Sequence, residues 1–330
     1  MKKILTAASL FILFGIFLSS CLKDQSLTMD KNLSNSVTEF ANTGTPATLP
    51  VNGAPVRFAI DLGSLKVGDT TSFNVNVDYA GADMAPNDIQ VVVDLDASLL
   101  ATYNTAHKAD GADYSMPPAN LLRGKFPITI TIPKGKQYAQ AKIPVQLTAD
   151  YDFNADYALP LKITSTSTGI TSGNFSTALY SLNVRNIYDG EFNVTGTFVD
   201  VTTATFHDAY PKEIGLATLG AKSNGYWDPN LNGGMFGYAF KNGTSGSYFG
   251  NFAPVFNFDD AGNVVSVSNY YGNATQNSSK RDAQLDPSGI NKMTFDSNGK
   301  PKQLDVSYFM LQAGSIRLKI TETFVYIGER

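Results

Sequence analysis

Short runs in which apolar and polar residues alternate constrain this chain most. In Ser72–Asp78, and again in Phe126–Ile132, every second residue is apolar. Because successive side chains of a strand point to opposite faces, this pattern is typical of half-buried β-strands. Further strands are predicted at Ile89–Leu95, Tyr138–Val145, Tyr157–Ile163 and Leu179–Val184. Many short strands separated by Gly and Pro turns predict a β-sandwich.

A single helical turn interrupts this pattern. Asp96 or Ser98 can cap it, and Leu99, Leu100 and Tyr103 form its apolar side. We expect Leu99 and Leu100 to pack into the core.

The second half of the chain continues the alternation, for example in Leu304–Tyr308 and Ile316–Ile320. Asp259–Asn263 and Thr294–Lys300 are predicted turns between paired strands. Antiparallel ribbons of this kind predict a barrel or a second sandwich. The fold class expected for the whole chain is therefore all-β.

The first residues are typical of an export signal. Lys2 and Lys3 precede an apolar run from Ile4 to Leu18, which is shorter than the roughly 18–20 residues of a membrane-spanning helix. Leu18-Ser19-Ser20-Cys21 follows and resembles a bacterial lipobox. We expect cleavage before Cys21 and anchoring to a membrane by lipid on that cysteine.

Cysteine and charge counts exclude several functions. Cys21 is the only cysteine in 330 residues, so no internal disulfide can form. Loss of Lys2 and Lys3 with the signal peptide takes the 25 basic residues to 23, and the net charge from −4 to about −6. This acidic balance argues against nucleic acid as a partner and offers no polybasic membrane surface.

We divide the chain into four parts by composition. They are a signal peptide (1–20), a lipidated cysteine and tether (21–54), a sandwich domain (55–186) and a C-terminal antiparallel β-domain (187–330). The tether is rich in Asn, Ser, Thr, Pro and Gly and has few large apolar residues, so it need not pack. The charged residues that directly follow Cys21 favour display on the outer face of the outer membrane.

Asp94–Asn104 resembles the helix motif of a Bacteroidetes lipoprotein domain, the domain of unknown function 1735 (DUF1735). Ile130–Gly135 and Tyr157–Thr164 resemble two further motifs of that domain in the same order. Three segments resemble the C-terminal β-domain that often follows it, namely Tyr188–Phe192, Tyr210-Pro211 and Tyr326–Arg330. The resemblance implies an immunoglobulin-like N-terminal module in an outer-membrane lipoprotein, often encoded near glycan-uptake systems like those for starch. It supplies no binding motif.

Aromatic residues beside amides and carboxylates are the candidates for carbohydrate recognition, because sugar rings stack on flat amphipathic faces. The strongest candidate loop runs from Tyr226 to Gly234 and contains Trp227, Asp228 and Asn230. Two other segments supply the remaining candidates, namely Tyr248, Tyr270 and Tyr271. The alternative is that these rings are buried, with Trp227 closing one end of the barrel.

Metal and catalytic signals are weak. Asp150–Asp156 resembles the start of a calcium loop, but Ala155 replaces the turn glycine and Leu161 stands where a bidentate glutamate is needed. We therefore expect no metal or cofactor, and leave calcium open at this segment. The chain has no Gly-x-Ser-x-Gly elbow and no nucleotide-binding loop, so an enzyme is not expected.

The sequence therefore favours a non-catalytic, surface-displayed lipoprotein that binds a polysaccharide or oligosaccharide. A TonB-dependent transporter complex is a further expected partner. Two alternatives stay open. One is an adhesin or scaffold that contacts another protein, and the other is a lipid-anchored glycoside hydrolase with two carboxylates about 5–10 Å apart.

Overall fold

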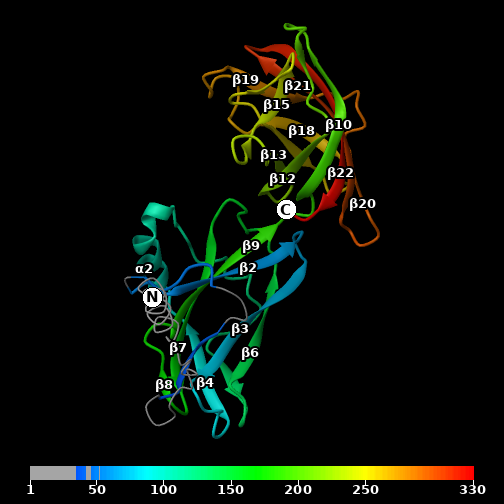
Figure 1. Ribbon diagram of the computed structural model, residues 1–330. Helices are drawn as coiled ribbons and strands as arrows, with labels where there is room; N and C mark the ends of the chain where they lie inside the picture. Colours follow the sequence, from blue (N-terminus) through cyan, green and yellow to red (C-terminus); the bar gives the residue numbers. More distant parts are fainter. Residues whose placement is uncertain (1–34, 42–45, 52) are drawn as a thin grey trace, which may run out of the picture.

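The computed structural model describes residues 35–41, 46–51 and 53–330. Cys21, the predicted lipidation site, lies outside these residues. Strands dominate the described chain, which confirms the predicted all-β fold class, and Figure 1 shows them in two lobes. One hydrophobic core extends from Phe40 to Val184, and a second from Tyr188 to Phe324.

The N-terminal lobe is a sandwich of two sheets. The first sheet has the order β6-β3-β1-β8, with β6 Tyr138–Gln146, β3 Thr70–Ala80, β1 Val37–Phe40 and β8 Ile170–Thr171. The second has the order β2-β9-β7-β4-β5, with β2 Val56–Ser64, β9 Thr177–Arg185, β7 Tyr157–Thr166, β4 Ile89–Leu95 and β5 Ile128–Ile132. The alternating residues Phe73, Val75 and Val77 are buried between the sheets, as the sequence predicted.

One short helix, α2 (Ser98–Ala106), and a 3₁₀ turn, η1 (Lys108–Asp110), lie between β4 and β5. Leu100 and Tyr103 are buried against β7 and β9, and Leu99 packs beside them, as expected. The N-cap is Ala97 and makes no side-chain cap bond. Asp96 instead accepts hydrogen bonds from the amide and hydroxyl of Ser98.

The C-terminal lobe is an up-and-down barrel, the first of the two predicted alternatives. Its hydrogen-bonded path is β18-β17-β13-β12-β10-β22-β21-β19, with β14 paired to β13 and β20 paired to β21. The bounds are β10 Gly190–Asp200, β12 Lys212–Gly220, β13 Ser223–Asp228, β14 Met235–Phe236, β17 Pro254–Phe258, β18 Val264–Asn269, β19 Arg281–Leu285, β20 Lys292–Phe295, β21 Pro301–Gln312 and β22 Ser315–Gly328. Because β10 pairs with β22 and the path's end strands β18 and β19 contact each other, the sheet is nearly closed.

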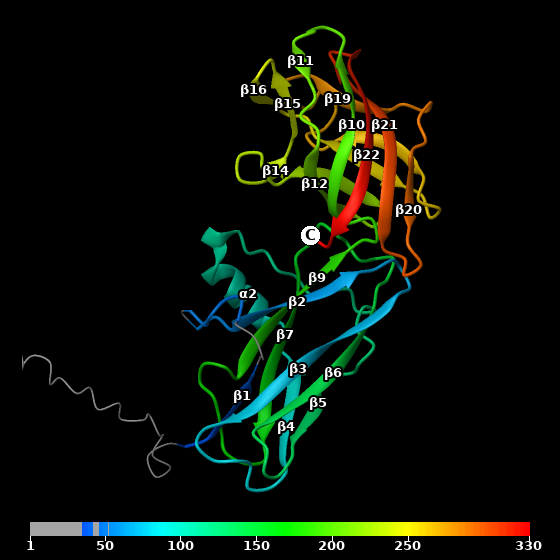
Figure 2. The ribbon, with the colours of Figure 1, turned by 45° about the vertical axis from the view of Figure 1, so that its right-hand side comes forward.

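A small sheet covers the end of the barrel that lies away from the sandwich (Figure 2). It has the order β11-β15-β16, with β11 Phe206–His207, β15 Tyr238–Asn242 and β16 Ser245–Phe249. Phe240 and Phe249 stack on each other with ring centroids 4.3 Å apart, and both rings lie against Phe198 of β10. These phenylalanines, rather than Trp227, fill this end of the barrel.

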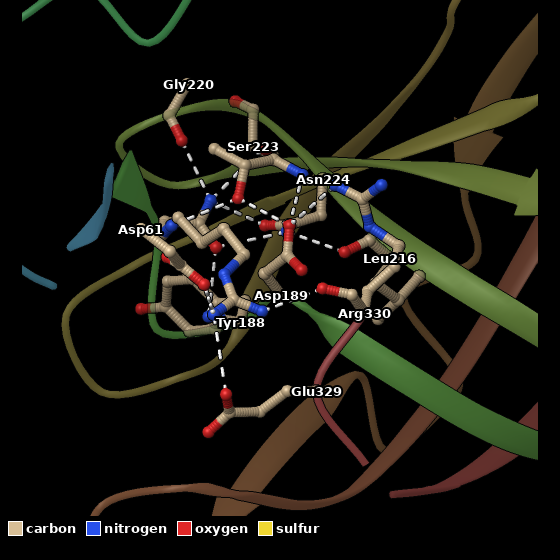
Figure 3. A network of polar contacts seen from close by, with 12 residues as sticks. Asp61, Tyr188, Asp189, Leu216, Gly220, Ser223, Asn224, Glu329 and Arg330 are labelled. Carbon is tan, nitrogen blue, oxygen red and sulfur yellow. Dashed lines mark hydrogen bonds and ion pairs between the residues drawn. The ribbon is translucent and has the colours of Figure 1, made fainter. Parts of the chain in front are cut away.

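A polar network joins the two lobes (Figure 3). Arg185, at the end of β9, donates hydrogen bonds to Asp61, Glu329 and the backbone carbonyl of Arg330. The following residue, Asn186, is fully buried and bonds to Gly220, Ser223 and Asn224 of the barrel. The short link between the lobes is therefore held by specific hydrogen bonds on both sides.

Candidate functional site

Trp227 lies on the outer face of the barrel. It is half-buried on β13, whereas its neighbour Tyr226 is fully buried inside. This follows from the strand geometry, since adjacent residues point to opposite faces. The placement removes Tyr226 from the candidates for ligand contact and leaves Trp227 accessible at the surface.

Asp228 supports the loop after Trp227. Its side chain is 5% exposed, and Oδ1 accepts hydrogen bonds from the amides of Asn230 and Leu231. Such bonds hold a tight turn and occupy the carboxylate oxygen, so Asp228 has a structural role in this loop. Gly234 then passes so close to the indole that a Cβ there would lie 2.9 Å from the Trp227 ring.

Three aromatic residues extend from Trp227 across the outer face. Phe236, on β14, meets Trp227 edge-on with centroids 5.1 Å apart, and stacks on Tyr270 at 4.0 Å. Tyr271 stands perpendicular to Tyr270 at 5.2 Å and donates a hydrogen bond to the Phe236 carbonyl at 2.7 Å. We call Trp227, Phe236, Tyr270 and Tyr271 the outer aromatic surface.

The outer aromatic surface remains open to solvent. Tyr270 is 43% exposed although one ring face packs on Phe236. Tyr248, on β16, is 42% exposed. Burial raises the pKa of Tyr271, and Tyr270 and Tyr248 nearby raise it further. The structure thus brings together four predicted candidates, Trp227, Tyr248, Tyr270 and Tyr271, from three separate segments.

Asn269 fixes the loop that carries the two tyrosines. Its amide donates to the carbonyls of Asn251, Gly272 and Arg281, and its oxygen accepts from the amide of Ala253. These bonds join the end of β18 to the segments before β17 and at the start of β19. The loop from 271 to 280 also carries exposed amide and hydroxyl side chains. Asn230, in the loop after β13, adds one more exposed amide.

The barrel interior holds a different polar cluster around Glu322, which is fully buried. Its carboxylate accepts hydrogen bonds from Tyr210 at 2.7 Å, Tyr238 at 3.0 Å and Tyr308 at 2.6 Å. Tyr226 adds a longer bond at 3.4 Å. Tyr226, which does not reach the outer surface, thus uses its hydroxyl inside the barrel.

Lys212 is the cation of this cluster. Its Nζ lies 3.7 Å from Glu322 Oε1 and 3.9 Å from the ring centroid of Tyr238. It makes no hydrogen bond to any residue in the described part of the chain. Burial lowers the pKa of Lys212, while the Glu322 carboxylate opposes that shift. Burial and the same carboxylate raise the pKa values of Tyr226, Tyr238 and Tyr308 well above 10.0. We interpret this cluster as a polar core of the barrel, because its carboxylate is inaccessible to solvent.

The segment that resembled a calcium loop forms a simple turn. Asp152 Oδ1 accepts from the backbone amide and the side chain of Asn154. Within residues 35–41, 46–51 and 53–330, no three His, Cys, Asp or Glu side chains cluster as a metal site would require. In the same residues, no helix has the length and apolar character needed to cross a bilayer.

Phe236 and the anchoring role of Asn269, which begins the candidate segment of Tyr270 and Tyr271, were not predicted from the sequence. Phe236 joins Trp227 to Tyr270, and the signal for it was the glycine pair Gly233-Gly234, which turns the chain back beside Trp227. Asn269 carried no local signal, because its partners lie up to 18 residues away in sequence. The groove beside α2, described below, was also not predicted.

Comparisons with known proteins bear on fold and family. Residues 40–170 match a family model described as an N-terminal domain. A crystal structure of a protein of unknown function from Bacteroides ovatus aligns at 17% identity and a TM-score of 0.55, covering 89% of this chain and 95% of that chain. A Bacteroides ovatus multidomain protein including DUF1735 aligns at 13% identity and a TM-score of 0.40, covering 88% and 92%. A search of curated proteins finds no match. The first of these alignments shows that the chain resembles a Bacteroides protein in fold, in line with the resemblance predicted from the sequence.

Proposed function

We propose that this chain, which resembles Bacteroidetes proteins with a DUF1735 domain at the N-terminus, is a surface-displayed, non-catalytic lipoprotein that binds glycans. The outer aromatic surface is the observation that carries the proposal. It presents Trp227 and Tyr270 on a rigid barrel, next to loops with exposed amides and hydroxyls. This combination suits a sugar chain, because apolar ring faces can stack on the aromatic residues while amides bond to hydroxyls.

The contacts that hold these aromatic rings in place favour ligand binding without a conformational change at the site. Gly234 and Phe236 pack against Trp227, and Asn269 anchors the loop of Tyr270 and Tyr271. Side chains that are already fixed lose little conformational entropy when a ligand binds. The surface is open rather than enclosed, which fits an extended polysaccharide better than a small free sugar.

Anchoring through Cys21 completes the proposal. Lipid on that cysteine would hold the chain at the outer membrane, facing outward. The sandwich already includes β1 (Val37–Phe40), so part of the segment 21–54 predicted as a tether packs in the fold. The barrel follows the sandwich in sequence, so the sandwich can act as a spacer. A polysaccharide captured by the barrel would then be passed to an uptake system, for which a TonB-dependent transporter is the proposed partner.

Affinity gels and isothermal titration against soluble plant and host polysaccharides would test this function. The protein used is the chain from Gln25 to Arg330, which includes every described residue. We expect one class of glycan to bind, and Trp227→Ala and Tyr270→Ala each to weaken binding at least tenfold, about 1.4 kcal/mol. Tyr138→Ala is the matched control, because Tyr138 is a 39% exposed tyrosine on the sandwich.

Three results would contradict the proposal. Absence of binding to every glycan would favour the adhesin or scaffold alternative, which a pull-down with the transporter or host proteins would then examine. Release of reducing sugar from a bound glycan would favour the hydrolase alternative. Binding that is unchanged in Trp227→Ala and Tyr270→Ala would place the glycan elsewhere on the protein.

A further inference from the structure

Two adjoining cavities lie in the sandwich, with volumes of about 330 and 370 Å³, and the second of them lies beside α2. Both are lined by Arg57, Tyr114 and Asp156, so they share a wall and form one groove. We call it the α2 groove. The outer aromatic surface does not contribute to it, whereas Asn154 and Asp156 belong to the segment that resembles the start of a calcium loop.

Arg57 is held in this groove by two hydrogen bonds. Its Nε donates to the Tyr103 hydroxyl at 3.0 Å, and Nη1 donates to Ser181 Oγ at 2.9 Å. Tyr103 in turn donates to Thr48 at 3.1 Å. Nη2 has no hydrogen-bond partner in the part of the chain that the structure describes. The guanidinium therefore keeps three of its five N–H groups free, in a fixed orientation.

Tyr114 supplies an aromatic face next to Arg57. The guanidinium carbon lies 5.7 Å from the centroid of this half-buried ring. Asn104, in α2, makes two hydrogen bonds to the backbone of Tyr114. Its side-chain amide donates to the Tyr114 carbonyl at 2.8 Å, and its side-chain oxygen accepts from the Tyr114 amide at 2.9 Å. Adjacent helix residues Tyr103 and Asn104 thus position the two principal groups of the groove.

Asp156 supplies acceptors in the same groove. It is exposed, and its side chain bonds to no residue among those described. The backbone fixes its distance from Tyr114, because the amide of Ser115 donates to the Asp156 carbonyl at 2.9 Å. Asn154 and Asn183 add amide groups to the same wall. The groove therefore combines one fixed cationic donor, one free carboxylate and several amides around a tyrosine ring.

The charges of the groove indicate a neutral ligand. Asp61 and Asp110 also line it, but Asp61 is paired with Arg185 and Asp110 contacts His107. Arg57 and Asp156 then remain with opposite charges. A strongly anionic or cationic ligand would meet one attractive and one repulsive group, whereas adjacent hydroxyls can accept from Arg57 and donate to Asp156.

We propose that the α2 groove is a second saccharide-binding site, which takes a neutral hexose or pentose unit against Tyr114 between Arg57 and Asp156. This inference rests on the proposed glycan-binding function, and it gives the sandwich a binding role in addition to that of a spacer.

The α2 groove adjoins a further cavity at the junction of the two lobes. Phe153 lines the α2 groove and also a cavity of about 540 Å³ at the junction with the barrel, where Lys66, Lys222 and Asp260 lie. In Figure 2, α2 and β14 project to the same side of the two lobes. One glycan chain could therefore contact both lobes, and two weak sites on one rigid protein raise the overall affinity by avidity.

Titration of the chain from Gln25 to Arg330 with neutral hexasaccharides (maltohexaose, cellohexaose, xylohexaose and mannohexaose) tests this inference, with hexagalacturonate as the charged comparison. The barrel surface is first disabled by Trp227→Ala with Tyr270→Ala. We expect a neutral hexasaccharide still to bind, and Tyr114→Ala or Asp156→Asn in that background to weaken the remaining binding at least tenfold.

Asp113→Asn is the matched control, because Asp113 is an exposed acid next to Tyr114 that does not line the groove. Asp156→Asn keeps the size of an exposed side chain, so it reports on the site even where Tyr114→Ala unfolds the sandwich. Binding that disappears completely with the barrel substitutions overturns the second site and leaves the proposed function intact. Residual binding that is unchanged by both groove variants, or that is stronger for hexagalacturonate, also overturns the second site and leaves the proposed function intact. Absence of saccharide binding by the unsubstituted protein overturns the proposed function and the second site together.

Discussion

Arg185 Nη1 donates a hydrogen bond of 2.8 Å to the backbone carbonyl of Arg330, the last residue of the chain. The same guanidinium bonds through Nη2 to Asp61 of the sandwich and Glu329 of the barrel. The Arg185 side chain is only 7% exposed, whereas those of Asp61 and Glu329 are more than half exposed. One buried cation at the end of β9 thus ties both lobes together.

Replacing Arg185 by Met should weaken the coupling between the lobes. The exposed acids can be solvated by water, so the expected loss is that of the hydrogen bonds, about 1–3 kcal/mol. Calorimetry should show a lower melting temperature and two transitions that separate further than in the unsubstituted protein. Arg123→Met, at an exposed position in the sandwich, should leave the transitions in place. Identical thermograms for Arg185→Met and the parent would show that the junction carries no coupling.

Removing the Glu322 carboxylate should destabilise the barrel strongly. Glu322→Ala leaves Lys212 buried without its counter-charge and four tyrosine hydroxyls without their carboxylate acceptor, at an expected cost of about 3–5 kcal/mol. Urea unfolding would measure the loss, with the exposed Glu191→Ala as control, expected to change stability by about 0.5 kcal/mol or less. The double variant Glu322→Ala/Lys212→Met should lose less than the sum of the two single losses, since it also removes the unpaired cation. Strict additivity would argue against this coupling.

Asp78 should make the sandwich more stable at mildly acidic pH. It lies directly opposite Glu39 in the β1–β3 pair, and burial together with that carboxylate raises its pKa from 3.8 to about 6. Between these two values the folded protein binds more protons than the unfolded chain, so its stability falls as the pH rises from about 4 to 6. Asp78→Asn should remove this loss, and Glu39→Gln should reduce it. Urea midpoints measured between pH 4 and 7 would reveal the effect, and parallel pH profiles for the parent and Asp78→Asn would refute it.

Asn269 should control the outer aromatic surface without contacting a ligand. Asn269→Ala removes the donor to the Asn251 carbonyl and the acceptor of the Ala253 amide, whereas the carbonyls of Gly272 and Arg281 keep Asn277 as a donor. The loss should cost about 2 kcal/mol locally. Hydrogen exchange should accelerate in the loop after β18, and glycan affinity should fall. Asn298→Ala, at an exposed turn between β20 and β21, is the control. Faster hydrogen exchange with unchanged glycan affinity would show that this loop does not contribute to glycan binding.

Much of the fold was predictable because strand patterning is local. The alternation in Ser72–Asp78 corresponds to the buried and exposed faces of β3, and the turn at Asp259–Asn263 joins β17 to β18 as expected. The sequence did not distinguish a barrel from a second sandwich in the C-terminal half. That choice depends on the pairing of β10 with β22, whose partners are more than 100 residues apart.

The candidate site was also predictable only in part, because it too depends on contacts between residues far apart in the sequence. The sequence alone determined the strands, the short helix and the composition of the aromatic segments, since each depends on neighbouring residues. Only the tertiary structure decided that Tyr226 faces Glu322 inside the barrel while Trp227 faces solvent, because closure of the barrel selects which face of β13 is buried. It alone also brought Arg57 to Ser181 across 124 positions of sequence. Contacts of that range arise when sheets pair and pack, and they leave no periodic pattern in the chain.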